Sequence, residues 1–435
     1  MKINGLSFNA LPPIDLPFRF FLSAPAFIIL CAVLIFISGE NLWSSRWQPS
    51  MLALTHGFTL GFITMVMLGA LLQLLPVIGG IGMAKPRLIA SLSHGALVIG
   101  TLCLMANFIW PSLLLTAVTL FLLCLGIGLY IAGIIWVLVK KLSQGDSIAG
   151  FRFAIISLIL TLLLGSFLLS KSFAIITINS FYHFDFIGKT LTNSHAVLGL
   201  VGWGSLLIIS VSFQVIPMFH LAPSFPKNIS QYLPMILFIL LLLAIFQPER
   251  VMPLVVLVHG IFAFFLLFII AKRKRKIADA SIHFWQLAAY TLMALNVGYF
   301  IPETYLPQNI VQNKTLLMAA VYIYFYIVTV IQGMLLKILP FLSYTHLQQR
   351  CLIHFSAMQF LPHMHEFIAK NQGRDLFILH LFTGAVLLST IMLPSLYWLL
   401  SLCLIIEFSW LLRLMIHTVR LYFSTLKKIN SSVNE

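Results

Sequence analysis

The sequence predicts an all-helical protein that crosses a membrane many times. Of its 435 residues, 60% are hydrophobic and only 9% are charged. The apolar residues gather in runs of about 20, the length of helix that spans a hydrocarbon core of about 30 Å. We therefore expect twelve spanning helices, at residues 17–38, 51–75, 88–109, 112–139, 152–177, 193–217, 230–246, 251–271, 282–302, 314–341, 376–394 and 396–423.

The basic residues predict how these helices are oriented. With the N-terminus inside, nineteen Lys and Arg residues lie in the leader, the even-numbered connections and the tail, and five lie on the opposite face. Connections rich in Lys and Arg face the cytoplasm. We expect a bacterial inner (cytoplasmic) membrane protein with both termini cytoplasmic. The net charge of +15 then reflects contact with anionic lipid, for example by the basic run at 272–276, and no nucleic-acid partner is expected.

A motif near the ends of the second, sixth and tenth predicted helices indicates an internal repeat. The motif reads Gln73-Leu-Leu-Pro76, Gln214-Val-Ile-Pro217 and Lys337-Ile-Leu-Pro340, at offsets of 141 and 123 residues. We expect a single domain, 1–435, built from three four-helix units at roughly 17–139, 152–271 and 282–423. The alternative is coincidence, since leucine-rich helices often end in proline. Segment 342–375 has helical apolar spacing and is expected at the cytoplasmic interface.

Three histidines are the candidate site residues. His56 and His195 stand near the starts of the second and sixth predicted helices, and His259 lies in the eighth. All three helices run from outside to inside, so at about 1.5 Å per residue the imidazoles share one layer. A histidine within the bilayer is costly, and imidazole suits copper, zinc and haem iron. We expect His56 and His195 to bind haem or copper, with His259 as a third metal ligand. The alternative is that each ring only hydrogen-bonds a neighbouring helix.

Other residues refine this expectation. Glycines beside the histidines leave room for a flat cofactor or for close helix packing, at Gly57, Gly61, Gly199, Gly202 and Gly204. Nine further histidines, His380 among them, are assigned to the inner half as structural or lipid-facing residues. Glu407 is the one deep carboxylate, and we expect it to pair with Arg413 and Lys337. The scarcity of carboxylates argues against a proton pump or an ion-coupled transporter.

Twelve helices in three groups of four, with histidines on the second and sixth, resemble subunit I of the haem–copper oxidases. In that family the second helix carries a haem-ligating histidine, matched here by His56, and the sixth a copper-ligating histidine, matched by His195. The likeness extends to the NnrS-type membrane proteins, which are associated with nitric oxide stress. The resemblance implies haem or copper as cofactor and respiratory or nitric oxide-related membrane proteins as partners, besides the lipid bilayer.

The sequence departs from the oxidases at the remaining ligands. The signature His-Pro-Glu-Val-Tyr is absent, because the chain reads His195-Ala-Val-Leu-Gly199. Residues 231–246 lack the paired copper histidines, and residues 315–326 carry tyrosines where the family has both haem ligands. We therefore expect nitric oxide or respiratory-metal handling without oxygen reduction, and no enzyme activity of the oxidase kind. The alternatives are a permease for a small solute or metal ion, and an assembly factor of a respiratory complex.

Overall fold

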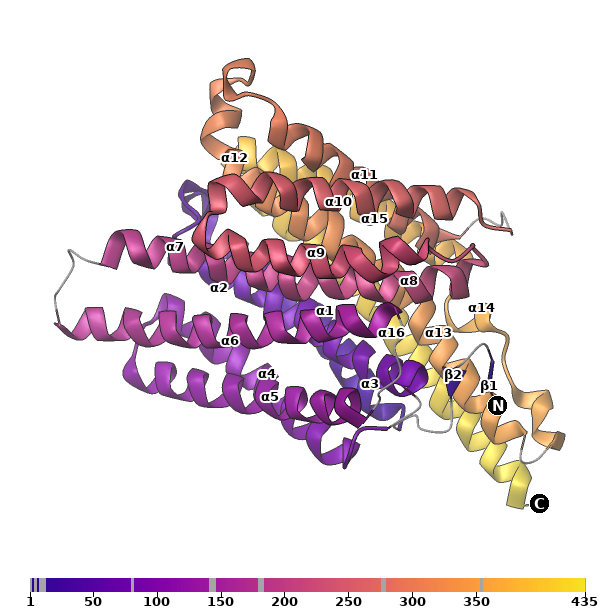
Figure 1. Cartoon of the computed structure of the whole chain (residues 1–435). Helices are drawn as coiled ribbons and strands as arrows, with labels where there is room; N and C mark the ends of the chain where they lie inside the picture. Colours follow the sequence, from indigo (N-terminus) through magenta and orange to yellow (C-terminus); the bar gives the residue numbers. More distant parts are fainter. Residues whose placement is uncertain are drawn as a thin grey trace.

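The chain forms a bundle of long helices that lie side by side, with both termini at one end (Figure 1). This computed structural model describes residues 2–3, 6–7, 13–79, 82–140, 146–178, 184–274, 279–352 and 355–434. Arg275 and Lys276 of the basic run lie outside these residues. Two short strands near the N-terminus, β1 (Lys2–Ile3) and β2 (Leu6–Ser7), pair antiparallel.

The helices follow the order of the predicted spans. The first third of the chain contains α1 (Asp15–Ser38), η1 (Gly39–Ser44), α2 (Pro49–His56), η2 (Gly57–Thr64), α3 (Met65–Gly79), α4 (Pro86–Ile109) and α5 (Leu113–Lys140). The middle third contains α6 (Asp146–Ile178), α7 (Phe184–Val197), η3 (Leu198–Ser205), α8 (Leu206–His220), α9 (Lys227–Phe246) and α10 (Pro248–Ala271). The last third contains α11 (Ala280–Phe300), η4 (Glu303–Tyr305), α12 (Gln308–Val321), η5 (Tyr322–Val328), α13 (Thr329–Cys351), η6 (Phe355–Phe360), α14 (Met364–Phe367), α15 (Lys370–Met392), η7 (Pro394–Leu396) and α16 (Tyr397–Asn434).

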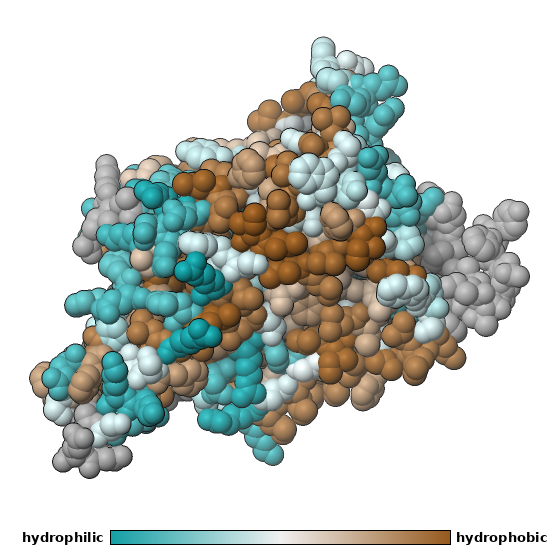
Figure 2. Space-filling view, turned by 180° about the vertical axis from the view of Figure 1, so that it is seen from behind, coloured by the Kyte–Doolittle hydropathy of each residue, from teal (hydrophilic) through white to brown (hydrophobic). Residues whose placement is uncertain are grey.

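Eleven of the helical spans in the described part of the chain are long and apolar enough to cross a membrane, which makes this a multi-pass membrane protein of the all-α class. The expected helix at 282–302 is also present, as α11, but it is not among the eleven. Its mean hydropathy is lower because it contains His283, Gln286 and Asn296. Figure 2 shows apolar side chains over the middle of one face, with hydrophilic side chains gathered mainly at the end that bears the termini.

The same neighbour relations recur in each third of the chain. The first long helix of each third packs against its second span: α1 against η2 and α3, α6 against η3 and α8, and α11 against η5 and α13. The last helix of each third packs against the first helix of the next, as α5 does on α6 and α10 on α11. The ring closes because α16 packs along α1. The second spans of the three thirds therefore lie inside the bundle.

The motif prolines do not end their helices, which corrects one sequence-based expectation. Pro76, Pro217 and Pro340 lie inside α3, α8 and α13, and each helix continues beyond its proline. Proline removes one backbone hydrogen bond, but neighbouring helices keep such a helix intact within a membrane protein. The first residues of the expected interfacial segment 342–375 are consequently a continuation of α13 to Cys351.

Candidate functional site

Three π-helical segments mark the centre of the bundle. They are η2, η3 and η5, and each interrupts the second span of its third of the chain. Adding 141 to the first and last residue numbers of η2 gives the first and last residues of η3. Adding 123 to the last residue number of η3 gives the last residue of η5. The middle segment contacts both others. A π-helical turn is rare and frequently lies at a functional site.

Side-chain hydrogen bonds join the three π segments. The indole Nε1 of Trp203 in η3 donates to the hydroxyl of Thr64 in η2, at 3.1 Å. The hydroxyls of Ser205 in η3 and Tyr326 in η5 are 2.9 Å apart. Thr64 and Ser205 are equivalent under the 141-residue offset, as are Phe62 and Trp203. The same kind of bond therefore occurs twice. An aromatic side chain of η3 bonds a hydroxyl of η2, and an aromatic side chain of η5 bonds the equivalent hydroxyl of η3.

His56 and His195 lie together near the starts of two of these π segments, His56 directly before η2 and His195 three residues before η3. Their ring centroids are 6.2 Å apart and their planes differ by 24°. Nδ1 of His56 donates to the carbonyl oxygen of Leu52 at 2.8 Å, and Nδ1 of His195 donates to that of Thr161 at 3.0 Å. A carbonyl oxygen can only accept, so the hydrogen of each neutral ring is on Nδ1 and the lone pair is on Nε2. Neither Nε2 has a hydrogen-bond partner among the described residues.

Neighbouring groups hold the two rings in place. The phenyl ring of Phe108 on α4 lies against His56, with centroids 5.1 Å apart. Gly165 on α6 makes room for His195, because a Cβ at this glycine would come within 2.8 Å of Cε1 of the imidazole. Backbone carbonyls and close packing therefore fix the orientation of both rings before any ligand binds.

The glycines around the pair serve close packing. A Cβ at Gly57 would meet Sγ of Cys31 at 2.3 Å, and one at Gly61 would meet the ring of Phe27 at 2.3 Å. Gly202 is similarly close to Ser157. Neighbouring side chains thus occupy the space in front of these glycines. Of the two uses expected for them, the structure shows close helix packing.

His259 lies in a different set of contacts. Its Nδ1 donates to the carbonyl oxygen of Val255, at 2.8 Å. Its Nε2 is 2.9 Å from the hydroxyl of Ser205 and 3.0 Å from that of Tyr322. A neutral ring satisfies these bonds when both hydroxyls donate to Nε2, which uses its lone pair. Within the described part of the chain, no three His, Cys, Asp or Glu side chains are grouped to hold a metal, so the expected third ligand does not join the pair.

The structure reveals a second histidine site that the sequence did not indicate. Glu407 on α16 and His380 on α15 are both 0% exposed, and Nδ1 of His380 lies 2.8 Å from Oε1 of the carboxylate. Nε2 of Gln332 donates to the same oxygen at 2.6 Å. The hydroxyl of Tyr324 donates to Oε2, also at 2.6 Å. This cluster ties η5, α13, α15 and α16 together.

Both nitrogens of His380 are hydrogen-bonded in this cluster. Nε2 lies 2.7 Å from the hydroxyl of Thr329, which donates its single hydrogen to the carbonyl oxygen of Tyr324 at 3.0 Å. The imidazole therefore bridges Thr329 and Glu407, with one of them on each ring nitrogen. The carboxyl group of Glu407 accepts further hydrogen bonds from Gln332 and Tyr324. His380 is thus neither lipid-facing nor isolated.

The expected partners of Glu407 lie elsewhere. Residues six apart on a helix do not share a face, so Arg413 cannot reach Glu407 and lies against the ring of Trp410 at 5.2 Å. Lys337 forms an ion pair with Asp279, which caps α11 through the backbone N–H of Ser281. Burial favours the neutral form of this carboxyl, but Lys337 and Ser281 outweigh burial and lower the pKa of Asp279. The position of Glu407 deep in a predicted helix did indicate that it has a buried partner, but the sequence did not identify that partner.

The search for relatives gives no further assignment. No protein-family model matches this chain, and no curated protein sequence matches it.

Proposed function

We propose that this protein is a bacterial inner-membrane protein that binds a copper ion, or alternatively haem, through His56 and His195. Its role is the handling of nitric oxide or of respiratory metal, without oxygen reduction. The proposal extends the resemblance to haem–copper oxidase subunit I and to the NnrS-type proteins. It also includes the topology, with both termini cytoplasmic and the histidine pair near the outer face, which rests on the uneven distribution of basic residues.

The observation that carries the proposal is the geometry of the paired imidazoles. Two rings that share one metal, at about 2.0 Å from each nitrogen, have centres roughly 5 to 6 Å apart. The observed separation of the ring centroids is 6.2 Å, close to this range. A carbonyl acceptor on Nδ1 is the usual support for a histidine that binds metal through Nε2. Both rings have this support, His56 from Leu52 one turn earlier in its own helix and His195 from Thr161 on α6.

The surroundings favour a single ion over haem. The side chains of Cys31, Phe27 and Ser157 occupy the space in front of the glycines that could have faced a porphyrin plane. An ion needs only the two nitrogens and a small space between them. Imidazole nitrogen suits copper, zinc, iron and nickel, and copper is bound most tightly in the general order of affinity. When bound, copper would supply a redox-active centre and a binding position for nitric oxide, while the chain orients the rings.

Metal analysis of the purified protein, with absorption and EPR spectra, tests the proposal. We expect about one copper per chain, lost in His56→Ala and His195→Ala. His283→Ala is the matched control, because His283 is exposed and lies against Phe377, away from the pair. Stoichiometric haem with a Soret band that both substitutions remove would support the haem form. Metal-free, colourless protein after loading with copper and with haem would overturn the proposal.

A further inference from the structure

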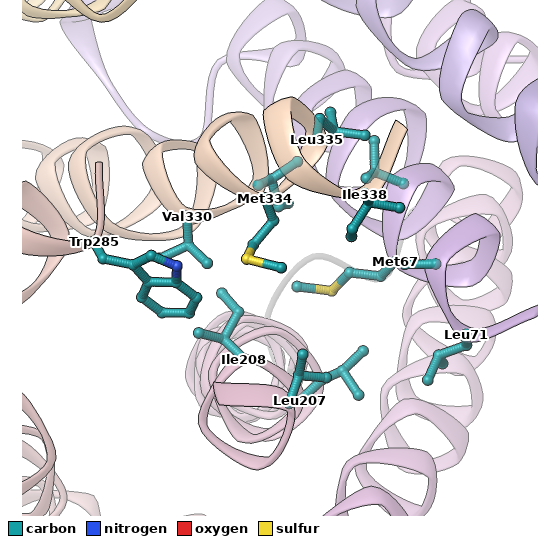
Figure 3. Close-up of a pocket in the computed structure, with 13 residues that line it drawn as sticks. Met67, Leu71, Leu207, Ile208, Trp285, Val330, Met334, Leu335 and Ile338 are labelled. Atoms are coloured by element: carbon teal, nitrogen blue, oxygen red, sulfur yellow. The ribbon is translucent and has the colours of Figure 1, made fainter. Parts of the chain in front are cut away.

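A partly open cavity with an apolar wall lies between the three inner helices, beyond the π segments. Its volume is about 70 Å³. Residues of α3, α8 and α13 form most of the wall, and Trp285 of α11 closes one end (Figure 3). Figure 3 also shows the side chains of Met67 and Met334 pointing toward each other across the space. No polar atom contributes to the wall.

The wall is built from equivalent turns of the three helices. The offsets of 141 and 123 residues carry Met67 onto Ile208 and then onto Ile331. The same offsets carry Ala70 onto Val211 and Met334. The space therefore lies where the three inner helices meet. Ala70 is much smaller than the methionine at its equivalent position, and this difference leaves volume on one side.

The chemistry of the wall selects the occupant. A buried water needs roughly 10–15 Å³ and two to four polar partners, and this wall has room for water but exposes no polar area to the space. An apolar cavity of about 150 Å³ in another protein stays dry and accepts benzene or xenon. A cavity of about half that volume has room for an apolar guest of one or two atoms. Methionine side chains adapt their shape to such a guest.

We propose that this cavity binds a small, uncharged, apolar molecule of diatomic size, that is, a dissolved gas. Such molecules concentrate in the hydrocarbon core of a bilayer and need no aqueous path to reach the inner helices. The site is separate from His56 and His195, because no lining residue belongs to the helical turns that carry the pair. The inference does not depend on metal binding, so either proposal can fail without the other.

Xenon is the probe, because it is apolar, uncharged and of similar size to a diatomic gas. Crystals of the full chain under xenon pressure should show xenon between Met67, Ile208 and Met334, and Ala70→Leu should abolish that density. Met334→Ala enlarges the space, so it should retain xenon and also admit cyclopropane, which the unaltered chain excludes. This second variant keeps the test decisive if Ala70→Leu does not fold.

Three outcomes would overturn the inference. They are the absence of xenon from the cavity in the unaltered chain, equal xenon density in Ala70→Leu, and a lipid acyl chain that occupies the space under xenon pressure. Gly128→Ala is the control for handling and crystal quality, because a Cβ at this glycine meets nothing within 4 Å.

Discussion

The two histidine sites of this protein use the same side chain in opposite ways. At His380, both nitrogens and the facing carboxylate are hydrogen-bonded, and the whole group is buried. At His56 and His195, Nδ1 of each ring is bonded to a carbonyl, while each Nε2 has no partner among the described residues. A buried ring with both nitrogens bonded specifies the packing of its helices, whereas an unsatisfied nitrogen held in a fixed orientation is available to a ligand. The difference separates a structural site from a candidate binding site.

The largest effect is expected from breaking the buried pair. Glu407→Ala leaves His380, Gln332 and Tyr324 without their shared partner, and each buried polar group left unsatisfied costs about 1–3 kcal/mol. The free energy of unfolding in detergent measures this loss. Glu407→Gln, which keeps one oxygen as an acceptor, should cost less. A loss below about 1 kcal/mol in Glu407→Ala would show that the cluster does not stabilise the bundle.

At the pair formed by His56 and His195, binding and stability should separate. His195→Ala removes one bond to a carbonyl at a half-buried position, so we expect a loss of about 1 kcal/mol or less together with loss of bound copper. Unfolding and metal analysis of the same preparation give both quantities. A loss as large as that of Glu407→Ala, with copper retained, would reverse the roles assigned to the two sites.

A smaller, graded effect on binding is expected at Gly165. Gly165→Ala places a methyl group within 2.8 Å of Cε1 of His195, which must turn the ring away from its present orientation. Displacing a group that orients a metal ligand typically costs about 10- to 100-fold in affinity. Copper titration of the apoprotein measures this change. Gly298→Ala, where a Cβ meets nothing within 4 Å, should bind like the unaltered chain, and equal affinity in both variants would contradict the assignment.

The smallest effect is expected where an ion pair is partly exposed. Asp279→Asn keeps the cap of α11 but removes the charge that faces Lys337, and we expect a loss of about 1 kcal/mol near neutral pH. The folded pKa of Asp279 lies below its ordinary value of 3.8, so its contribution is present above that value and disappears as pH falls through the folded pKa. Unfolding at pH 7 and near pH 3 should show the difference shrink. A constant difference would mean that the charge is not responsible.

Several features of the fold were predictable from periodicity and composition. The runs of apolar residues predicted every long helix, because a segment within lipid must satisfy its backbone internally and has little choice but to be helical. The repeated motif also predicted equivalent positions, and the π segments follow its offsets. The motif prolines were misleading as helix ends, since helix breaking by proline is weaker where neighbouring helices support the backbone.

The candidate sites were only partly predictable. The sequence singled out His56 and His195 because two imidazoles recur at similar depth in a repeated helix. It could not exclude His259, whose lone pair is used by Ser205 and Tyr322 from other helices. It also paired Glu407 with charges on its own helix or at an inner helix end, where His380 on a neighbouring helix is the partner.

Composition and spacing alone determined that this chain is a helical membrane protein, because the thickness of a hydrocarbon core and the rise of a helix are fixed lengths. Only the tertiary structure decided which nitrogens are free and which are satisfied, because hydrogen bonds between helices depend on rotation and crossing. The apolar cavity is also a feature that only the tertiary structure decided. Its existence depends on how Ala70, Val211 and Met334 meet, and no single helix contains that information.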